Sequence, residues 1–221
     1  MVDTKAEHGY WGIRGLGAMS RLTAAAAGAD INDVKLTDQQ KWKEEQKKEL
    51  DTHLPNLPYL KVDGVVITEH DAIVRYIATK WKPELLGATP AEKALVEQYF
   101  TALVKCNGKF RSLHFKKDPV ATEEELEKSV EEHATLLDAI NKRLADHKWI
   151  VSENVSIVDI YFHEVHLGLT VSSKAAVEKR EHFKRWLADF EKEQWYVDYV
   201  ASGNWIEKPL YPPAFAALNY A

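Results

Sequence analysis

Hydrophobic and polar positions divide this chain into two parts with different patterns. Up to about residue 82, short apolar stretches alternate with segments of helical character. The predicted elements are a short first strand, a helix over 18–29, a strand over 34–36, a polar helix over 41–50, a strand pair that turns at Asp63-Gly64, and a helix over 71–81. Strands and helices interleaved in this order predict an α+β domain.

Beyond residue 90 the pattern is helical and shows little strand character. Prolines and a glycine between 83 and 90 predict a linker, and Pro90 stands where the first turn of a long helix to about residue 115 would begin. Apolar residues at three- and four-residue spacing predict a second long helix over 122–147. We therefore predict a first domain over 1–82, a linker over 83–90 and an all-helical domain with a C-terminal tail over 91–221.

Composition narrows the class of protein. Hydrophobic residues make up 45% of the 221 residues and charged residues 29%, which is typical of a soluble globular protein. A formal net charge of −5 argues against nucleic acid as the main partner. A single cysteine, Cys106, excludes an intrachain disulfide and a cysteine-based metal cluster. Neither a secretory signal nor a membrane-spanning run is recognisable, so we expect a cytoplasmic location and no membrane partner.

The segment from Leu54 to Ala78 carries the most functional information. Pro58 lacks a backbone N–H and pushes Leu57 into an extended conformation, so the backbone groups of Leu57 are available to a peptide-like ligand. Glu69-His70-Asp71 then begins a helix whose unpaired N–H groups can receive a carboxylate. A segment of this kind favours a glutathione site.

This segment resembles the thioredoxin-like domain of the cytosolic glutathione transferases. The signature of that domain is an extended loop with a proline (cis in the family), then a DG turn, and then an acid or amide plus Ser or Thr that opens a helix. The run Tyr10-Trp11-Gly12-Ile13-Arg14-Gly15-Leu16 is similar to the first-strand motif of the mu class. Ala24-Ala25-Ala26 with Gly28 is more similar to the alpha or sigma class. Ser156-Ile157-Val158-Asp159 resembles the N-capping box of the family's buried helix. The resemblance covers nearly the whole chain and implies a thioredoxin-like βαβ-α-ββα domain followed by a helical one.

The resemblance implies that Tyr10 is the catalytic residue. A free thiol titrates near 8.5, so little of it is thiolate at neutral pH. A phenol hydroxyl that donates to the thiolate favours the charged form and lowers the pKa of the thiol. We expect Tyr10 to do this for glutathione, which would be a co-substrate.

The same resemblance implies a set of glutathione-binding residues: Trp11, Leu16, Trp42, Lys47, Asn56, Leu57, Pro58, Glu69 and His70. Lys47 would meet the glycine carboxylate, and Asn56 and Leu57 the cysteinyl part. The spacing from Trp42 to Asn56 is one residue longer than the family pattern, so Gln46 competes with Lys47.

Three features depart from the family pattern. Glu69-His70 replaces an acid or amide followed by serine. Lys105 stands where an acid of the long helix normally reaches the glutamyl amine across a dimer, and a lysine there would repel it. The first strand should be apolar if the sheet is covered, yet residues 4–8 are mostly polar.

An electrophile pocket is expected between Tyr10, the long helix and the aromatic, proline-rich tail at 204–213. Phe110, Phe115 and Tyr211 are its candidate walls, together with Leu16. Leu54 stands where mu-like proteins place an aromatic residue that inserts into the partner subunit, so a homodimer is expected.

Two other sequence patterns resemble known binding motifs but do not match them. Residues 12–17 are not a G-x-G-x-x-G loop, and His163 and His166 are three residues apart rather than four, so no dinucleotide or metal site is predicted. The favoured hypothesis is an enzyme that conjugates the glutathione thiolate to apolar electrophiles, as in detoxification. A transferase-fold protein without catalysis, like the lens crystallins of this fold, and a glutathione-dependent isomerase remain the alternatives.

Overall fold

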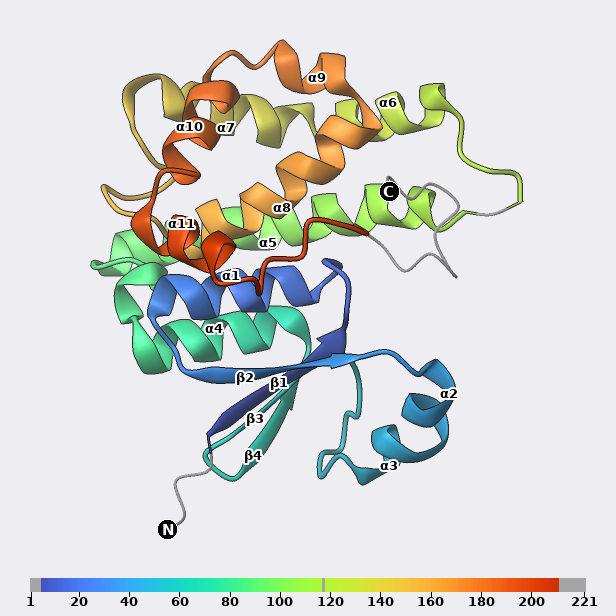
Figure 1. Ribbon diagram of the computed structural model, residues 1–221. Coiled ribbons are helices and arrows are strands. Elements are labelled where there is room, and N and C mark those ends of the chain that lie inside the picture. Colours follow the sequence, from blue (N-terminus) through green and yellow to red (C-terminus); the bar gives the residue numbers. More distant parts are fainter. Residues whose placement is uncertain (1–4, 117, 211–221) are drawn as a thin grey trace.

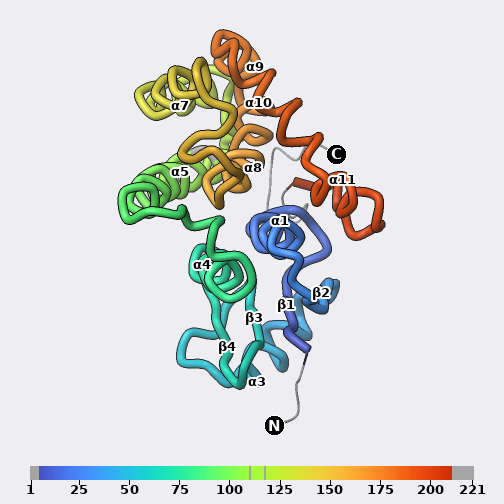
Figure 2. The backbone as a smooth tube through the Cα atoms, turned by 90° about the vertical axis from the view of Figure 1, so that its left-hand side faces the viewer, coloured from blue at the N-terminus to red at the C-terminus, as the bar shows by residue number. Residues whose placement is uncertain are grey.

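The structure, a computed structural model, describes residues 5–116 and 118–210, and Phe110 only by its backbone. A four-stranded sheet lies at one end and a group of helices at the other (Figure 1). Helices α1 (Gly17–Ala27) and α4 (His70–Trp81) lie side by side between the sheet and the other helices (Figure 2). This is the glutathione transferase architecture that the sequence predicts, a thioredoxin-like domain joined to a helical one.

The sheet is mixed, with strand order β2-β1-β3-β4. Its strands are β1 (Ala6–Trp11), β2 (Ile31–Leu36), β3 (Tyr59–Val62) and β4 (Val65–Thr68). β1 pairs with β2 in parallel and with β3 antiparallel, and β3 pairs with β4 antiparallel. The hairpin turns at Asp63 and Gly64, both with positive φ, as the sequence indicates.

The polar first strand, β1, is an inner strand of the sheet. Its polar side chains are accommodated there because they form hydrogen bonds to neighbouring strands. Glu7 accepts a hydrogen bond from the Tyr59 hydroxyl at 3.0 Å, and His8 Nδ1 lies 2.8 Å from the carboxylate of Asp33. The expectation that an inner strand must be apolar is therefore wrong here, because Glu7 and His8 both have a partner on a neighbouring strand. Gly9 is required as well, since a Cβ at this position would lie 2.1 Å from the Tyr59 ring.

Helix α1 ends where Gly28 adopts a left-handed conformation (φ 64°), which lets the N–H groups of residues 28 and 29 reach back to Ala25 and Ala24. The polar helix predicted over 41–50 is a helical run over 39–49. It consists of α2 (Gln39–Lys41), a π-helical turn η1 (Trp42–Gln46) and α3 (Lys47–Glu49).

The remaining helical elements follow a 3₁₀ turn, η2 (Pro83–Leu86). They are α5 (Pro90–His114), α6 (Glu123–Glu131), α7 (Ala134–Asp146), α8 (Ile157–Ser172), α9 (Lys174–Glu178), α10 (His182–Phe190) and α11 (Gln194–Ala201). The prediction of one continuous helix over 122–147 is wrong. His133 leaves helical geometry and its ring Nδ1 lies 2.8 Å from the carbonyl of Ser129, which separates α6 from α7.

Helix α8 runs through the centre of the helical part and is buried along nearly its whole length. The capping box predicted at its start is present: the Ser156 hydroxyl accepts the N–H of Val158, and the Asp159 carboxylate accepts the N–H of Ser156 at 3.0 Å. Asp159 also accepts from Trp186 of α10 at 3.2 Å, so this cap also joins two helices.

Two negative findings apply to the described residues only. No helix among them is long and apolar enough to span a bilayer. No group of three or more His, Cys, Asp or Glu side chains among them is arranged to hold a metal ion.

Candidate active site

Tyr10 is the next-to-last residue of β1, and its hydroxyl lies under the loop that joins β1 to α1. The backbone N–H of Leu16 donates to this hydroxyl at 3.2 Å. Burial raises the pKa of Tyr10, opposed by the Leu16 hydrogen bond and by the charges of Arg111 and Arg21. The phenol therefore keeps its proton at neutral pH, and because it accepts from Leu16 that proton remains available for donation.

Glycines allow the loop to approach the phenol this closely. A Cβ at Gly15 would lie 2.7 Å from the Tyr10 hydroxyl, and one at Gly17 would lie 2.5 Å from the ring. Gly15 also has a positive φ of 44°. Gly15 inside the motif and Gly17 directly after it are thus two positions where any side chain would displace Tyr10.

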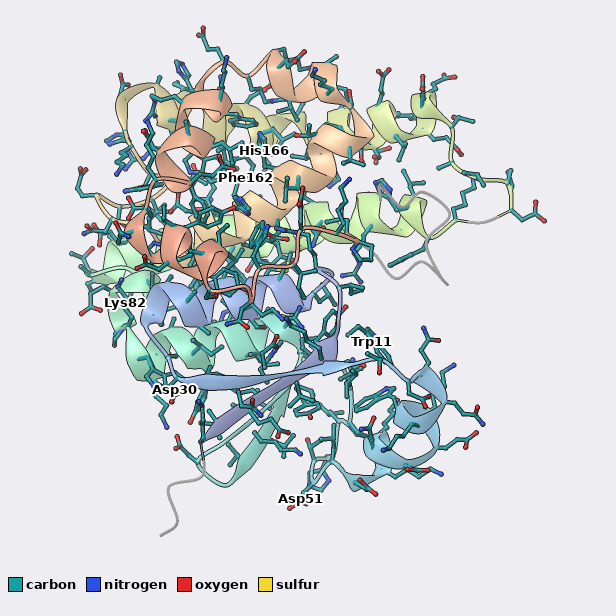
Figure 3. All side chains as sticks on the ribbon, viewed as in Figure 1. Trp11, Asp30, Asp51, Lys82, Phe162 and His166 are labelled. Carbon is teal, nitrogen blue, oxygen red and sulfur yellow. The ribbon has the colours of Figure 1, made fainter. Side chains whose placement is uncertain are left out.

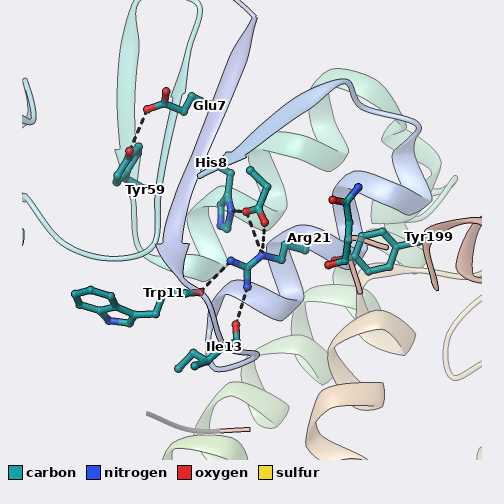
Figure 4. A network of polar contacts seen from close by, with 9 residues as sticks. Glu7, His8, Trp11, Ile13, Arg21, Tyr59 and Tyr199 are labelled. Carbon is teal, nitrogen blue, oxygen red and sulfur yellow. Dashed lines mark hydrogen bonds and ion pairs between the residues drawn. The ribbon is translucent and has the colours of Figure 1, made fainter. Parts of the chain in front are cut away.

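Two arginines hold this loop. Arg21 of α1 donates to the carbonyls of Ile13 at 2.7 Å and Trp11 at 3.1 Å, and its guanidinium pairs with Asp33 (Figure 4). Arg14 points the other way and forms a buried ion pair with Glu164 of α8. The loop that covers Tyr10 is therefore fixed to β2 by one arginine and to the helical domain by the other.

The segment after α11 lies against the same loop. Arg14 and Gly15 donate their backbone N–H groups to the carbonyls of Pro209 at 3.1 Å and Leu210 at 2.9 Å. Trp205 stacks on the Arg14 guanidinium at 4.1 Å, and the carbonyl of Ile206 accepts from it at 2.9 Å. The chain thus returns to the Tyr10 loop just before the described residues end.

The loop before β3 has the form that the resemblance implies. The Leu57-Pro58 peptide bond is cis, and Leu57 is half-buried beside the exposed Asn56. The Asn56 amide donates to the Glu69 carboxylate at 3.1 Å, so both residues lie on one side of the hairpin. Glu69 precedes α4 in a strained backbone conformation (φ 66°), which presents the first N–H groups of the helix.

His70 has a partner that the sequence does not indicate. Its Nε2 lies 3.1 Å from the hydroxyl of Tyr161 on α8, and that hydroxyl accepts from Asn107 of α5 at 3.3 Å. Burial lowers the pKa of His70 to about 4, so the neutral ring accepts the Tyr161 proton. The His70 side chain is therefore part of a hydrogen-bonded chain that links α4, α8 and α5. What His70 can still offer at the start of α4 is its backbone N–H.

The π turn accounts for the unusual spacing between Trp42 and Asn56. A π turn contains one more residue than an α turn, and the N–H of Lys47 bonds back to the carbonyl of Trp42, five residues earlier. The π turn therefore accommodates the extra residue before Lys47. The Lys47 side chain is exposed, whereas Gln46 is half-buried and lines a cavity beside Trp42 and Tyr59. This geometry favours Lys47 over Gln46.

The two tryptophans differ in exposure. Trp42 is 7% exposed and stacks on Tyr59 with ring centroids 6.4 Å apart, so most of its surface belongs to the core. Trp11 meets it edge-on at 6.5 Å and remains half-exposed at the end of β1, where Figure 3 shows it near the α2 segment.

Helix α5 carries two cationic residues that differ in their relation to the site. Lys105 is exposed on it. Arg111 is half-buried, and its charge acts on Tyr10, His70 and Tyr161. Sequence reasoning missed Arg111, as it missed Arg14 and Arg21. Arg14 lies inside the recognised motif and could have been found there.

The candidate walls of the electrophile pocket are described only in part. Leu16 is half-buried beside Tyr10, and Phe115 is half-buried at the end of α5 with the Arg111 guanidinium 5.8 Å from its ring. The side chain of Phe110 and all of Tyr211 lie outside the described residues.

Comparison with known proteins agrees with this arrangement. The family profile "Glutathione S-transferase, N-terminal domain" matches residues 6–79, and "Glutathione S-transferase, C-terminal domain" matches residues 106–193. Glutathione S-transferase Mu 1 of Macaca fascicularis is 28% identical over 211 residues, covering 92% of this chain and 94% of that protein. Glutathione S-transferase Mu 4 of Homo sapiens has the same identity and coverage.

Solved structures show the same fold. The glutathione S-transferase from Ascaris lumbricoides has a TM-score of 0.78 at 21% identity and covers 94% of this chain and all of that one. The glutathione S-transferase Blo t 8 has a TM-score of 0.84 at 19% identity and covers 97% of this chain and all of that one. The chain belongs to the glutathione S-transferase family.

Proposed function

We propose that this protein is a glutathione transferase that activates the glutathione thiol with Tyr10 and conjugates it to apolar electrophiles. The observation that carries the proposal is a buried phenol that keeps its proton and whose oxygen accepts from Leu16 at 3.2 Å. Such a group can donate to a sulfur placed above it and stabilise the thiolate. In the reaction the thiol proton passes to solvent, and the thiolate sulfur then forms a bond to a carbon atom of the electrophile. The leaving group departs from that carbon with its electron pair.

The rest of the site would hold glutathione as a co-substrate. The backbone of Leu57 would pair with the cysteinyl residue, and the first N–H groups of α4 would receive the γ-glutamyl carboxylate. Lys47 would meet the glycine carboxylate. Arg111 adds a positive charge on the Tyr10 side, which favours a thiolate over a thiol.

We place the protein in the cytoplasm as a homodimer. Leu54 supports a dimer, because its side chain is 69% exposed on the loop before β3, and large exposed apolar side chains mark contact sites. Light scattering on wild type and on Leu54→Ser tests this: a monomeric wild type contradicts the dimer.

The experiment that tests the activity compares Tyr10→Phe with wild type and with Tyr76→Phe. Tyr76 is the matched control because its hydroxyl donates to the surface carboxylate of Asp63 at 2.6 Å, at the turn between β3 and β4. Glutathione binding is measured by calorimetry, and conjugation of chlorodinitrobenzene is followed against pH. We expect all three proteins to bind glutathione and turnover to fall about 10- to 100-fold in Tyr10→Phe alone, which corresponds to one or two pKa units of the thiol.

Two outcomes would contradict the proposal in different ways. Absence of glutathione binding to wild type at millimolar concentration would favour the non-catalytic binding or structural protein, for which the engaged His70 side chain and Lys105 are the supporting observations. Equal turnover in Tyr10→Phe and wild type would leave a transferase that does not use this phenol. An isomerase would bind glutathione and depend on Tyr10 without forming a conjugate.

A further inference from the structure

The side chain of Arg111 on α5 has neither a hydrogen-bond partner nor an ion-pair partner among the described residues. Every other arginine of the chain donates to a carboxylate or a backbone carbonyl: Arg14, Arg21, Arg75, Arg143, Arg180 and Arg185. A guanidinium carries several N–H donors in a fixed fork, so Arg111 has its whole donor capacity left for a bound molecule or for solvent.

The position of Arg111 on α5 places it on the side of the Tyr10 site. Asn107, one turn earlier on the same face, is buried and donates to the Tyr161 hydroxyl. The charge of Arg111 acts on Tyr10, His70 and Tyr161, which belong to β1, α4 and α8. Arg111 is half-buried and none of its guanidinium nitrogens is fully buried, so a molecule bound beside Tyr10 can reach these donors.

The surroundings of Arg111 combine an apolar ring with carboxylates that are already paired. Phe115 lies one turn later on α5, with its ring centroid 5.8 Å from the guanidinium carbon. At the beginning of α4, Glu69 accepts from the Asn56 amide at 3.1 Å. Asp71 lies 3.6 Å from another arginine of the same helix. The counter-charge for Arg111 therefore has to come from a bound molecule or from solvent.

These features define the chemistry of a molecule that fits beside Tyr10. A carboxylate accepts two parallel hydrogen bonds from a guanidinium fork, and such charge-assisted bonds are stronger than neutral ones. The Phe115 ring beside the charge and the half-buried Leu16 suit an apolar body. An unpaired cation beside apolar walls thus favours a molecule that has an apolar body and one acid group.

We propose that Arg111 makes the electrophile site selective for electrophiles with an apolar body and a carboxylate, which the guanidinium binds while the reactive carbon faces the thiolate. This inference rests on the proposed transferase function and specifies the substrate class of that same site. Arg111 acts here as a specificity-determining residue, and the carboxylate takes no part in bond formation.

The test compares an acid with its neutral ester. Ethacrynic acid and its methyl ester carry the same α,β-unsaturated ketone, and their dihydro forms lack the reactive double bond and can only bind. Calorimetry on the full chain measures the Kd of both dihydro forms, and kcat/KM is measured for both reactive forms with glutathione. The acid is expected to bind wild type at least about tenfold more tightly and to react with the higher kcat/KM, and this preference is expected to fall at least about tenfold in Arg111→Met.

Three further variants separate this role from others. Lys109→Met is the matched control, because it removes a positive charge from the exposed face of the same helix, where Lys109 pairs with Glu132 at 3.1 Å, and its acid-to-ester ratio should equal that of wild type. Arg111→Lys keeps the charge but not the fork, so its ratio should lie between those of wild type and Arg111→Met. Arg111→Gln is a second neutral variant in case Arg111→Met folds poorly. An effect of the charge on the thiolate alone changes the reaction of acid and ester equally and leaves the ratio as it is.

Two outcomes would overturn the proposal: equal binding of acid and ester by wild type, or a preference for the acid that both neutral variants retain. Failure of the proposed transferase function gives a different result. In that case neither reactive form is conjugated, while the preference for the dihydro acid and its loss in Arg111→Met still show the carboxylate site.

Discussion

Arg14 and Arg21 stand seven residues apart, yet they serve different regions of the molecule. The Arg14 side chain is 3% exposed, and so is that of its partner Glu164, which lies 150 positions away in the sequence. Arg21 is 5% exposed, but its partner Asp33 is 20% exposed and only 12 positions away. One ion pair joins two domains, and the other remains inside the first domain.

The surroundings of the two pairs differ as well. Around Glu164, Arg14, His163 and the backbone of the tail use the available hydrogen bonds, and the charge of Arg14 together with the His163 bond holds the pKa of Glu164 well below its usual range despite burial. Near Asp33, His8 Nε2 and Ser20 Oγ are buried and have no hydrogen-bond partner among the described residues. A fully hydrogen-bonded network makes the core rigid, whereas a network with unpaired buried atoms loses part of this stabilisation.

The largest expected effect comes from breaking the link between the domains. Arg14→Met leaves the buried carboxylate of Glu164 without its counter-charge, so we expect the free energy of unfolding to fall by about 4 kcal/mol in urea denaturation. Lys179→Met is the control, since it removes an exposed ion pair with Glu131 and should cost under about 1 kcal/mol. The double variant Arg14→Met with Glu164→Leu should recover much of the loss. Equal losses for Arg14→Met and Lys179→Met would contradict the distinction.

A smaller effect is expected for the pair inside the first domain. Arg21→Met should lower the free energy of unfolding by about 2 kcal/mol, because Asp33 keeps His8 as a partner and some contact with water. The carbonyls of Trp11 and Ile13 also lose their donor, so turnover should fall although Tyr10 is intact. Lys5→Met, at the exposed pair with Asp30, should change neither quantity. A loss as large as that of Arg14→Met would show that the partial exposure of Asp33 does not matter.

The smallest effect at pH 7 concerns His166, which lies in an aromatic environment beside Phe162 (Figure 3) and whose two ring nitrogens have no hydrogen-bond partner in the part of the chain that the structure describes. His166→Phe should raise the free energy of unfolding by about 1 kcal/mol at pH 7. Burial lowers the pKa of His166 from 6.5 to about 4, so between these values the unfolded chain binds the proton more readily and acid destabilises the fold. The advantage of His166→Phe should therefore grow as the pH falls from 6.5 towards 4.

Urea denaturation of both proteins at several pH values measures this growth. His53→Phe is the control, because His53 is exposed and its replacement should leave the pH dependence unchanged. Parallel curves for His166→Phe and wild type would mean that the pKa of His166 is the same in the folded and the unfolded chain.

Features that depend on neighbouring residues could be predicted from the sequence. The turn at Asp63-Gly64, the capping box at Ser156 and the end of α1 at Gly28 are present as expected. Such features are decided by the conformational range of glycine and by side chains that reach a backbone group a few residues away.

The tertiary structure decided which distant polar groups meet. The sequence suggested that the first strand was too polar and that His70 faced a ligand, but the fold supplies Tyr59 and Asp33 to the strand and Tyr161 to His70. It also paired Arg14 with Glu164, and it left His8 Nε2 and Ser20 Oγ without a hydrogen-bond partner among the described residues. A buried polar group takes whichever partner the packing of helices and strands brings within hydrogen-bond distance, and spacing along the chain does not contain that information.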